Sequence, residues 1–322
     1  MPRPRKIRRH PRPADLKDRK PFERIPLWLS LLAALPLPAW YRIADVLAWL
    51  AEYVFRYRRH VVDLQLGRCF PERDAGWIRV KRRAFYRNFT DVGVEILKAV
   101  SISGQEIRER VTLVETGPAR AALDAGQSIV VVTSHNCNWE WTLLGLSIGM
   151  GHPVHAAYKP LHGSWGDRLF LTIRSRFGAR MIPAKRLLMR VLRDRGPARI
   201  IAMVADQDPV SASVRHFTDF FGQDTAFYLG PEAIARVARM PVYYLAVRRL
   251  DRGHYRVTFE LLAVAGEELS QGAVIERFAR RVEALTREHP ADWLWSYRRW
   301  KVRRRRERGD DAERIEITSG SD

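Results

Sequence analysis

Alternation of short apolar runs with helix-forming segments, from about residue 111 onward, constrains the fold of this chain more than any other feature. Runs such as "SIVVVT" (128–133) and "RIIAMVAD" (199–206) are typical of buried strands. They are separated by helical segments of about ten to fifteen residues, a spacing that indicates crossovers between parallel strands. We therefore expect an α/β fold with a mixed, largely parallel sheet flanked by helices.

The composition agrees with a folded enzyme-sized chain in a reducing compartment. The 322 residues are 46% hydrophobic, which fits one large α/β domain or two small ones. Only two cysteines are present, Cys69 and Cys137, so the sequence does not favour a disulfide framework. No cleavable signal peptide is visible.

Positive charge is concentrated near both ends of the chain. The formal net charge is +20, and residues 1–24 carry ten Lys/Arg against three acids. The segment 298–308 carries eight against one, and an acidic tail follows it. Such clustering indicates a polyanionic partner, which composition alone leaves open among nucleic acid, anionic lipid headgroups and an acidic carrier protein.

The N-terminal region predicts helices that associate with a membrane. Residues 25–41 form an uncharged run of seventeen residues, near the lower limit for spanning a bilayer, and Pro36 and Pro38 would break it. An interfacial or shallowly inserted helix is therefore expected, with a buried helical hairpin as the alternative. The expected divisions are a basic disordered tail (1–24), membrane-associated helices (25–60), an α/β domain (61–303) and a charged tail (304–322).

The stretch "SHNCNWEW" (134–141) follows the first of these strands and is the main candidate for chemistry. Residues five apart do not share a helix face, so His135 must precede a helix that contains Glu140 if the two are to touch. Asn136 or Asn138 would cap that helix. A carboxylate on one imidazole nitrogen makes the other a better general base, and the nucleophile would then be a hydroxyl of the substrate.

Three other interpretations of this stretch stay open on the residues alone. His135 could be structural, and Cys137 could be a nucleophile, although no partner acid is evident for it. A metal site is the third possibility, but the spacing of the candidate ligands matches no tight motif, so we expect no metal. Those candidates are His135, Cys137, His152, His155 and His162.

Several motifs, taken in order, resemble the bacterial late acyltransferases of lipid A biosynthesis, within the glycerolipid acyltransferase superfamily. "SHNCNWEW" resembles the family's motif of a histidine, four residues and an acid. The resemblance covers roughly residues 25–303. The other matching segments are "DLQLGRCFPE" (63–72), "YRNFTDVGVEILK" (86–98), "AYKP" (157–160), "RSR" (174–176), "VADQDP" (204–209), "HFTDFFG" (216–222) and "WLWSYRRWK" (293–301).

This resemblance implies a glycerolipid acyltransferase-like fold and an O-acyltransferase on the cytoplasmic face of the bacterial inner membrane. The acyl chain would pass from acyl carrier protein, or from acyl-CoA, to a hydroxyl of an anionic membrane lipid, most simply a lipid A precursor, with no further cofactor. His135 would deprotonate that hydroxyl and Glu140 would orient His135. Arg174 aligns with the family's essential arginine, Asp206 with a family acid that would hold it or a nearby loop. Substrate binding would fall to Arg174, Asp206, Asn138 and Lys159.

Two loops depart from the family pattern and leave other acceptors open. "LHGSWGD" (161–167) replaces an Asn-Pro pair and "QDTAFYLGPEAIARVA" (223–238) replaces a threonine-rich stretch, so another glycolipid or a lysophospholipid is the alternative acceptor. A rival from another class is a nucleic-acid-binding protein, supported by the basic segments and by "WLWSYRRWKVRRRR" (293–306). The chain carries no recognisable DNA- or RNA-binding motif, so we expect no nucleic-acid partner.

Overall fold

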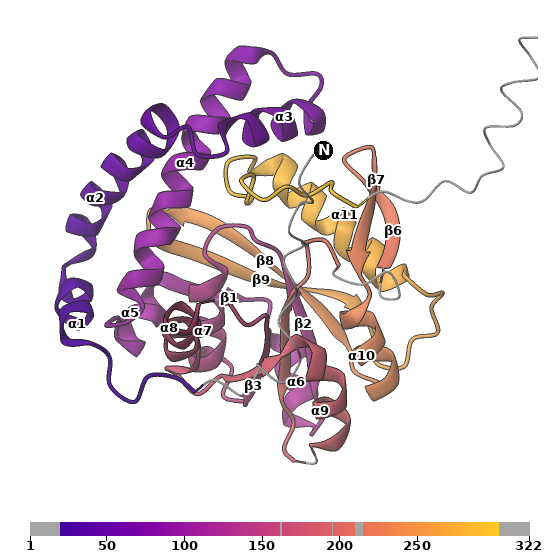
Figure 1. Cartoon of the computed structure of the whole chain (residues 1–322). Helices are drawn as coiled ribbons and strands as arrows, with labels where there is room; N and C mark the ends of the chain where they lie inside the picture. The colour runs from indigo at the N-terminus through magenta and orange to yellow at the C-terminus, as the bar shows by residue number, and fades with distance from the viewer. Residues whose placement is uncertain (1–19, 162, 195, 210–214, 303–322) are drawn as a thin grey trace, which may run out of the picture.

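The computed structural model describes residues 20–161, 163–194, 196–209 and 215–302. A seven-stranded sheet forms its centre, in the order β1-β9-β8-β2-β5-β3-β4 (Figure 1). All neighbouring pairs are parallel except β8 with β9, so the predicted mixed, largely parallel sheet is confirmed. The strands are β1 (Val111–Val114), β2 (Ile129–Thr133), β3 (Val154–Tyr158), β4 (Arg180–Pro183), β5 (Ile200–Val204), β8 (Val242–Asp251) and β9 (His254–Ala263).

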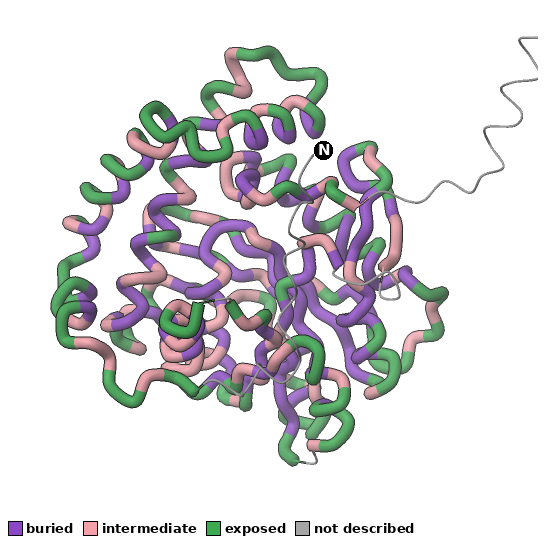
Figure 2. The backbone as a smooth tube through the Cα atoms, in the orientation of Figure 1, coloured by how far each residue is buried: buried purple, intermediate pink, exposed green. Residues whose placement is uncertain are grey.

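Helices cover both faces of this sheet because alternate residues of each central strand point to opposite sides. In β2, Val130 and Val132 belong to one apolar cluster, whereas Ile129 and Val131 belong to the other. The first cluster is completed by α3 (Arg59–Cys69), α9 (Leu187–Arg193), α10 (Gly230–Ala238) and α11 (Ala273–Glu288). The second is completed by α5 (Gly104–Arg110), α6 (Gly117–Asp124), α7 (Trp139–Gly149) and α8 (Ser164–Ser175). Figure 2 shows the resulting buried interior around the sheet.

A second, two-stranded sheet contains the motif "HFTDFFG" (216–222), a segment for which the sequence predicted no strand. Strands β6 (Arg215–Phe220) and β7 (Gln223–Tyr228) form an antiparallel hairpin. Its two turn residues, Phe221 and Gly222, both have positive φ, 57° and 69°. Positive φ at both central residues matches the twist of paired strands, which is why the Phe-Phe-Gly segment closes a hairpin.

The N-terminal helices pack along one side of the long helix α4 (Ala75–Lys98). Helix α1 (Leu27–Ala34) and helix α2 (Leu37–Trp49), which continues into a π-helical turn (η2, Leu50–Val54), meet at an angle of 96°. Pro36 lies at the break and Pro38 in the first turn of α2, as the prolines predicted. Of the helices in the described residues, none is by itself long and apolar enough to cross a bilayer, although this bent pair together has the required length and composition.

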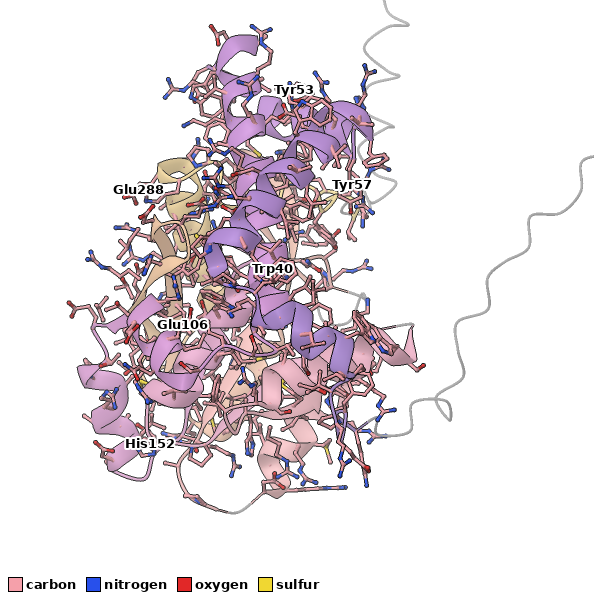
Figure 3. All side chains as sticks on the ribbon, turned by 90° about the vertical axis from the view of Figure 1, so that its left-hand side faces the viewer. Trp40, Tyr53, Tyr57, Glu106, His152 and Glu288 are labelled. Carbon is pink, nitrogen blue, oxygen red and sulfur yellow. The ribbon has the colours of Figure 1, made fainter. Side chains whose placement is uncertain are left out.

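One face of this helix pair is buried and the other is exposed, so the pair is not the buried hairpin considered as the alternative. Leu29 and Trp40 face inward, whereas Trp28, Leu31 and Val46 are more than half exposed. Figure 3 looks onto this side, where the helices run past Trp40 towards Tyr53 and Tyr57. We call the exposed side chains the apolar ridge; they are Leu27, Trp28, Leu31, Leu32, Leu35, Ile43, Val46, Leu47, Trp49, Tyr53, Val54, Phe55 and Tyr57.

Most of the predicted basic N-terminal tail, up to residue 19, and the whole predicted C-terminal tail (304–322) lie outside the described residues. Residues 20–24 of the first tail are described and precede α1.

Candidate active site

The candidate site lies at the carboxyl ends of two neighbouring strands. Strands β2 and β5 pair in parallel, with Thr133 opposite Val204. His135 follows β2 by two residues and Asp206 follows β5 by two residues, so the strand register brings both side chains to the same edge of the sheet. This edge is where α/β folds commonly assemble their active groups.

Asp206 holds His135 by both its ring and its backbone. The Nδ1 atom of His135 lies 2.5 Å from Oδ1 of Asp206, and the His135 backbone N–H donates to Oδ2 at 3.0 Å. The Trp293 indole also donates to Oδ2, at 2.8 Å. With Nδ1 donating to a carboxylate, Nε2 is left as the basic nitrogen. It lies 3.2 Å from the amide nitrogen of Gln207.

The carboxylate of Asp206 is held in its charged form although it is almost completely buried. Burial by itself raises the pKa of Asp206, but the neighbouring His135 and the hydrogen bonds from His135 and Trp293 bring the pKa below its ordinary value. An ionised carboxylate beside Nδ1 stabilises the imidazolium that forms when Nε2 accepts a proton.

Glu140 does not contact His135, which corrects the predicted pair. Its Oε2 accepts a hydrogen bond from Nε of Arg174 at 2.8 Å, and its Oε1 accepts one from Nη2 of Arg174 at 2.5 Å. The Trp139 indole also donates to Oε1, at 3.1 Å. Helix α7 begins at Trp139, so Glu140 lies in its first turn and faces Arg174 of α8. The carboxylate that contacts the His135 ring is that of Asp206, which the parallel pairing of β2 with β5 brings beside it.

Glu140 and Arg174 form a bidentate ion pair that is mostly buried. The side chain of Glu140 is 3% exposed and that of Arg174 is 21% exposed. Burial lowers the pKa of Arg174, but the Glu140 carboxylate outweighs this and raises it above its ordinary value. The Nη1 atom of Arg174 donates to no side chain or backbone group of the described residues, so it is available to an anionic group of a substrate.

The loop between β2 and α7 is fixed by the segment that follows α11. The backbone N–H of Cys137 donates to the Asp292 carbonyl at 2.8 Å, and Asn136 forms a bridge with Trp293. Cys137 adopts a positive φ of 54°, uncommon for a residue with a side chain. Asn138 ends the loop as the cap of α7, accepting from the Trp141 backbone N–H at 2.8 Å.

A cavity beside His135 is lined by both apolar and polar side chains, several of them from α4. Its polar lining includes Asn88, Arg249 and Asp292, which also line a second, more polar cavity between α4 and the β8–β9 turn. The two cavities thus adjoin. The apolar and aromatic lining of the first is Phe85, Phe89, Val92, Trp139, Tyr255, Ala291, Trp293 and Leu294.

Comparison with protein families decides the assignment. The family model described as "Bacterial lipid A biosynthesis acyltransferase" matches residues 25–302. The chain belongs to this family. A comparison with curated proteins finds no match.

As a lipid A biosynthesis acyltransferase, the protein is an enzyme that transfers an acyl chain onto a lipid A precursor, and its family is associated with the bacterial inner membrane. The family resemblance and the enzyme class expected from the sequence are confirmed. The rival interpretation as a nucleic-acid-binding protein is replaced by this assignment.

The other predicted site residues of the acyltransferase occupy different environments. Asn138 is fully buried and both ends of its amide bind protein groups, so it caps and anchors α7, and its predicted contact with substrate is not possible in this arrangement. Lys159 is exposed directly after β3, and it pairs with none of the described residues. Its role in substrate binding stays a prediction.

The alternatives for Cys137 and for a metal gain no support from the geometry. Burial raises the pKa of the Cys137 thiol well above its ordinary value, and the thiol donates to the Val247 carbonyl, so it lacks the ionised form of a nucleophile. Within the described ranges, His, Cys, Asp and Glu side chains do not gather in groups of three that could hold a metal ion. His162 lies outside those ranges.

Three residues at the candidate site were not anticipated from the sequence. The indole of Trp293 binds Asp206, the amide of Gln207 lies beside His135, and Arg249 lines the same cavity as His135. Gln207 lies within the "VADQDP" motif and Trp293 within "WLWSYRRWK". These motifs marked the segments as important, but they did not predict which side chains would contact His135 and Asp206.

Proposed function

We propose that His135 is the general base of an acyl transfer from acyl carrier protein to a hydroxyl of a lipid A precursor. The observation that carries this proposal is that Asp206 binds both the ring and the backbone of His135, which leaves Nε2 as the basic nitrogen of a residue that lines the cavity. Among the described residues that line the cavity, the Cys137 thiol is bound to a carbonyl and the Tyr255 hydroxyl to Glu95, so neither is free to act as nucleophile. The nucleophile is then the acceptor hydroxyl.

The proposed reaction proceeds by addition and elimination at the thioester carbon. Nε2 of His135 takes the proton of the acceptor hydroxyl as its oxygen bonds to the carbonyl carbon. The resulting oxyanion collapses, the carbon–sulfur bond breaks, and the leaving thiolate takes the proton back from Nε2. Asp206 stays ionised throughout and stabilises the imidazolium between these two steps.

Arg174 is proposed to bind the anionic part of the substrate, either a phosphate of the lipid or the developing oxyanion. Two guanidinium nitrogens of Arg174, Nε and Nη2, donate to Glu140, which fixes the plane of the guanidinium. The third nitrogen, Nη1, remains for the ligand. A planar, permanently charged group suits both kinds of oxygen. Glu140 is thus a positioning residue for Arg174, in place of the predicted orientation of His135.

The apolar ridge is proposed to seat the enzyme on the cytoplasmic face of the inner membrane. Its side chains belong to α1, α2, η2 and the residues beside these helices, on the side of the molecule seen in Figure 3, where a bilayer can bury them. The strongly basic chain adds attraction to anionic headgroups and to an acidic carrier protein. Seating on the cytoplasmic face gives access to both the carrier-bound donor and a membrane-resident acceptor.

The test is a reconstituted transfer reaction with the purified enzyme, a lipid A precursor in phospholipid vesicles, and either acyl carrier protein or coenzyme A thioesters. Mass spectrometry of the lipid is expected to show one added acyl chain, faster from the carrier-protein thioester. His135→Ala is expected to lose transfer while it still binds vesicles. Near-normal transfer by His135→Ala would refute the general-base assignment, and preference for coenzyme A would refute the donor assignment.

A further inference from the structure

Glu95, in the middle of α4, is a buried carboxylate that the proposed chemistry does not use. It is fully inaccessible to solvent, yet three side chains from three different elements donate to it. Tyr41 of α2 binds Oε1 at 2.9 Å. Asn138 and Tyr255 of β9 bind Oε2, at 2.7 and 2.6 Å.

Glu95 also holds the active-site helix through its backbone. The Glu95 carbonyl accepts from the Trp141 indole at 2.9 Å. Asn138 caps α7 and Trp141 lies in its first turn, on either side of Glu140, and Asn138 follows His135 by three residues. Glu95 therefore contacts the start of α7 through both its side chain and its backbone, and so holds the segment that leads from His135 to Glu140.

The opposite oxygen of Glu95 is tied to the helix that bears the apolar ridge. Tyr41 lies on α2, which packs against the outer side of α4, while the sheet lies on the inner side (Figure 1). Space for its hydroxyl is provided by Gly253 in the β8–β9 turn, where an added Cβ would lie 2.0 Å from the Tyr41 oxygen. A side chain at position 253 would therefore prevent the Tyr41 hydroxyl from taking this position, from which it binds Glu95.

We propose that Glu95 is a positioning residue, tied to α2 by Tyr41, that holds Asn138 and so keeps the first turn of α7 aligned with His135. This inference rests on the proposed function, because it assigns Glu95 a part in the same reaction. It identifies a side chain of α4 that acts on the reaction without touching substrate.

The test distinguishes the Glu95–Asn138 hydrogen bond from the capping of α7 by Asn138, and both from a general loss of stability. Asn138→Ser retains an oxygen that can cap α7 but is too short to reach Glu95. Glu95→Leu removes both side-chain acceptors and keeps the backbone carbonyl that binds Trp141, whereas Glu95→Gln keeps the side-chain shape and one acceptor oxygen. Glu232→Leu is the matched control, since Glu232 is also a buried carboxylate but binds the backbone N–H groups of Gly272 and Val274 at the start of α11.

Steady-state kinetics of acyl transfer, with cooperative unfolding checked for each variant, give the outcome. Asn138→Ser and Glu95→Leu are expected to lower kcat at least about tenfold with KM nearly unchanged, because a displacement of about 1 Å can cost about 100-fold in rate. Glu95→Gln is expected to recover most of the rate, and Glu232→Leu to lower only the melting temperature.

Wild-type kcat in Asn138→Ser would overturn this inference even if Glu95→Leu failed to fold. Equal losses in Glu95→Leu and Glu232→Leu, or an effect on KM alone, would also overturn it. Absence of transfer by the wild-type enzyme would instead overturn the proposed function and this inference with it.

Discussion

Nδ1 of His135 lies 2.5 Å from Oδ1 of Asp206, although the two residues are separated by 71 positions in the chain. The contact follows from the parallel pairing of β2 with β5, which ends both strands at the same level. It replaces the expected local partner, Glu140, which binds Arg174 instead.

Replacement of Asp206 by Asn is expected to lower kcat strongly without unfolding the enzyme. An amide can neither stabilise the imidazolium nor enforce the Nδ1–H tautomer, and general base catalysis contributes about 10²- to 10⁴-fold. The measurement is kcat for acyl transfer. Trp293→Phe, which removes one hydrogen bond to Asp206 and part of a buried ring but leaves the carboxylate in place, serves as the comparison with a smaller loss. An Asp206→Asn variant within about threefold of wild type would show that His135 does not depend on this carboxylate.

Loss of Glu140 is expected to destabilise the fold as well as reduce activity. Glu140→Ala leaves the Arg174 charge unpaired in a mostly buried position, at a cost of about 2–3 kcal/mol in the free energy of unfolding. Urea unfolding measures this cost. Glu288→Ala breaks an exposed pair with Arg248 and is expected to cost less than about 1 kcal/mol. Equal costs for the two variants would contradict the assigned burial of the Glu140 pair.

The stability contributed by Asp206 is expected to depend on pH in a defined direction. Its pKa in the folded protein is lower than in the unfolded chain, so the contribution is complete above roughly pH 4 and is lost as the pH falls through the folded value. The difference in unfolding free energy between wild type and Asp206→Asn should therefore be largest near neutral pH and shrink below about pH 4. A difference that grew on acidification would show that the carboxylate is not ionised in the folded state.

Acidic substitutions on the apolar ridge are expected to release the enzyme from membranes. Burying a large apolar side chain is worth about 1.5–3 kcal/mol, so Leu31→Asp/Val46→Asp should weaken partitioning into anionic vesicles at least about tenfold. Val237→Asp/Val264→Asp is the matched control, because both valines are as exposed as Val46 but lie outside the ridge. Co-sedimentation measures both variants. Equal weakening in the two would mean that net charge, and not the ridge, controls binding.

Both cysteines are expected to be inert in the native enzyme. Burial raises the pKa of the Cys69 and Cys137 thiols, so little thiolate forms at neutral pH. Treatment with a thiol-alkylating reagent should label neither residue until denaturant is added, and should leave transfer activity unchanged. Rapid native labelling of Cys137 with loss of activity would revive it as a nucleophile.

The fold was largely predictable because its signals are local. β-Branched runs and helical spacing marked most of the central strands and their crossovers, and Pro36 marked the break between α1 and α2. The hairpin β6–β7 was missed, since its turn depends on positive φ at Phe221 as well as at Gly222, and a phenylalanine gives no indication of that conformation.

The site was predictable in its members but not in its pairings. His135, Glu140, Arg174 and Asp206 were all identified, yet Glu140 was paired with His135 and Asp206 with Arg174 or a nearby loop, whereas the structure pairs His135 with Asp206 and Arg174 with Glu140. The observed partners depend on strand order and on the docking of the segment around Trp293, neither of which is encoded in a short motif.

Because one carboxylate restrains both the main chain and the imidazole of residue 135, that ring has almost no rotational freedom left to lose. Binding of a compound that mimics the tetrahedral adduct would therefore cost little conformational entropy of the His135 side chain that it contacts. Affinity gained at Nε2 should accordingly be retained almost in full, which makes this nitrogen the natural anchor for inhibitor design.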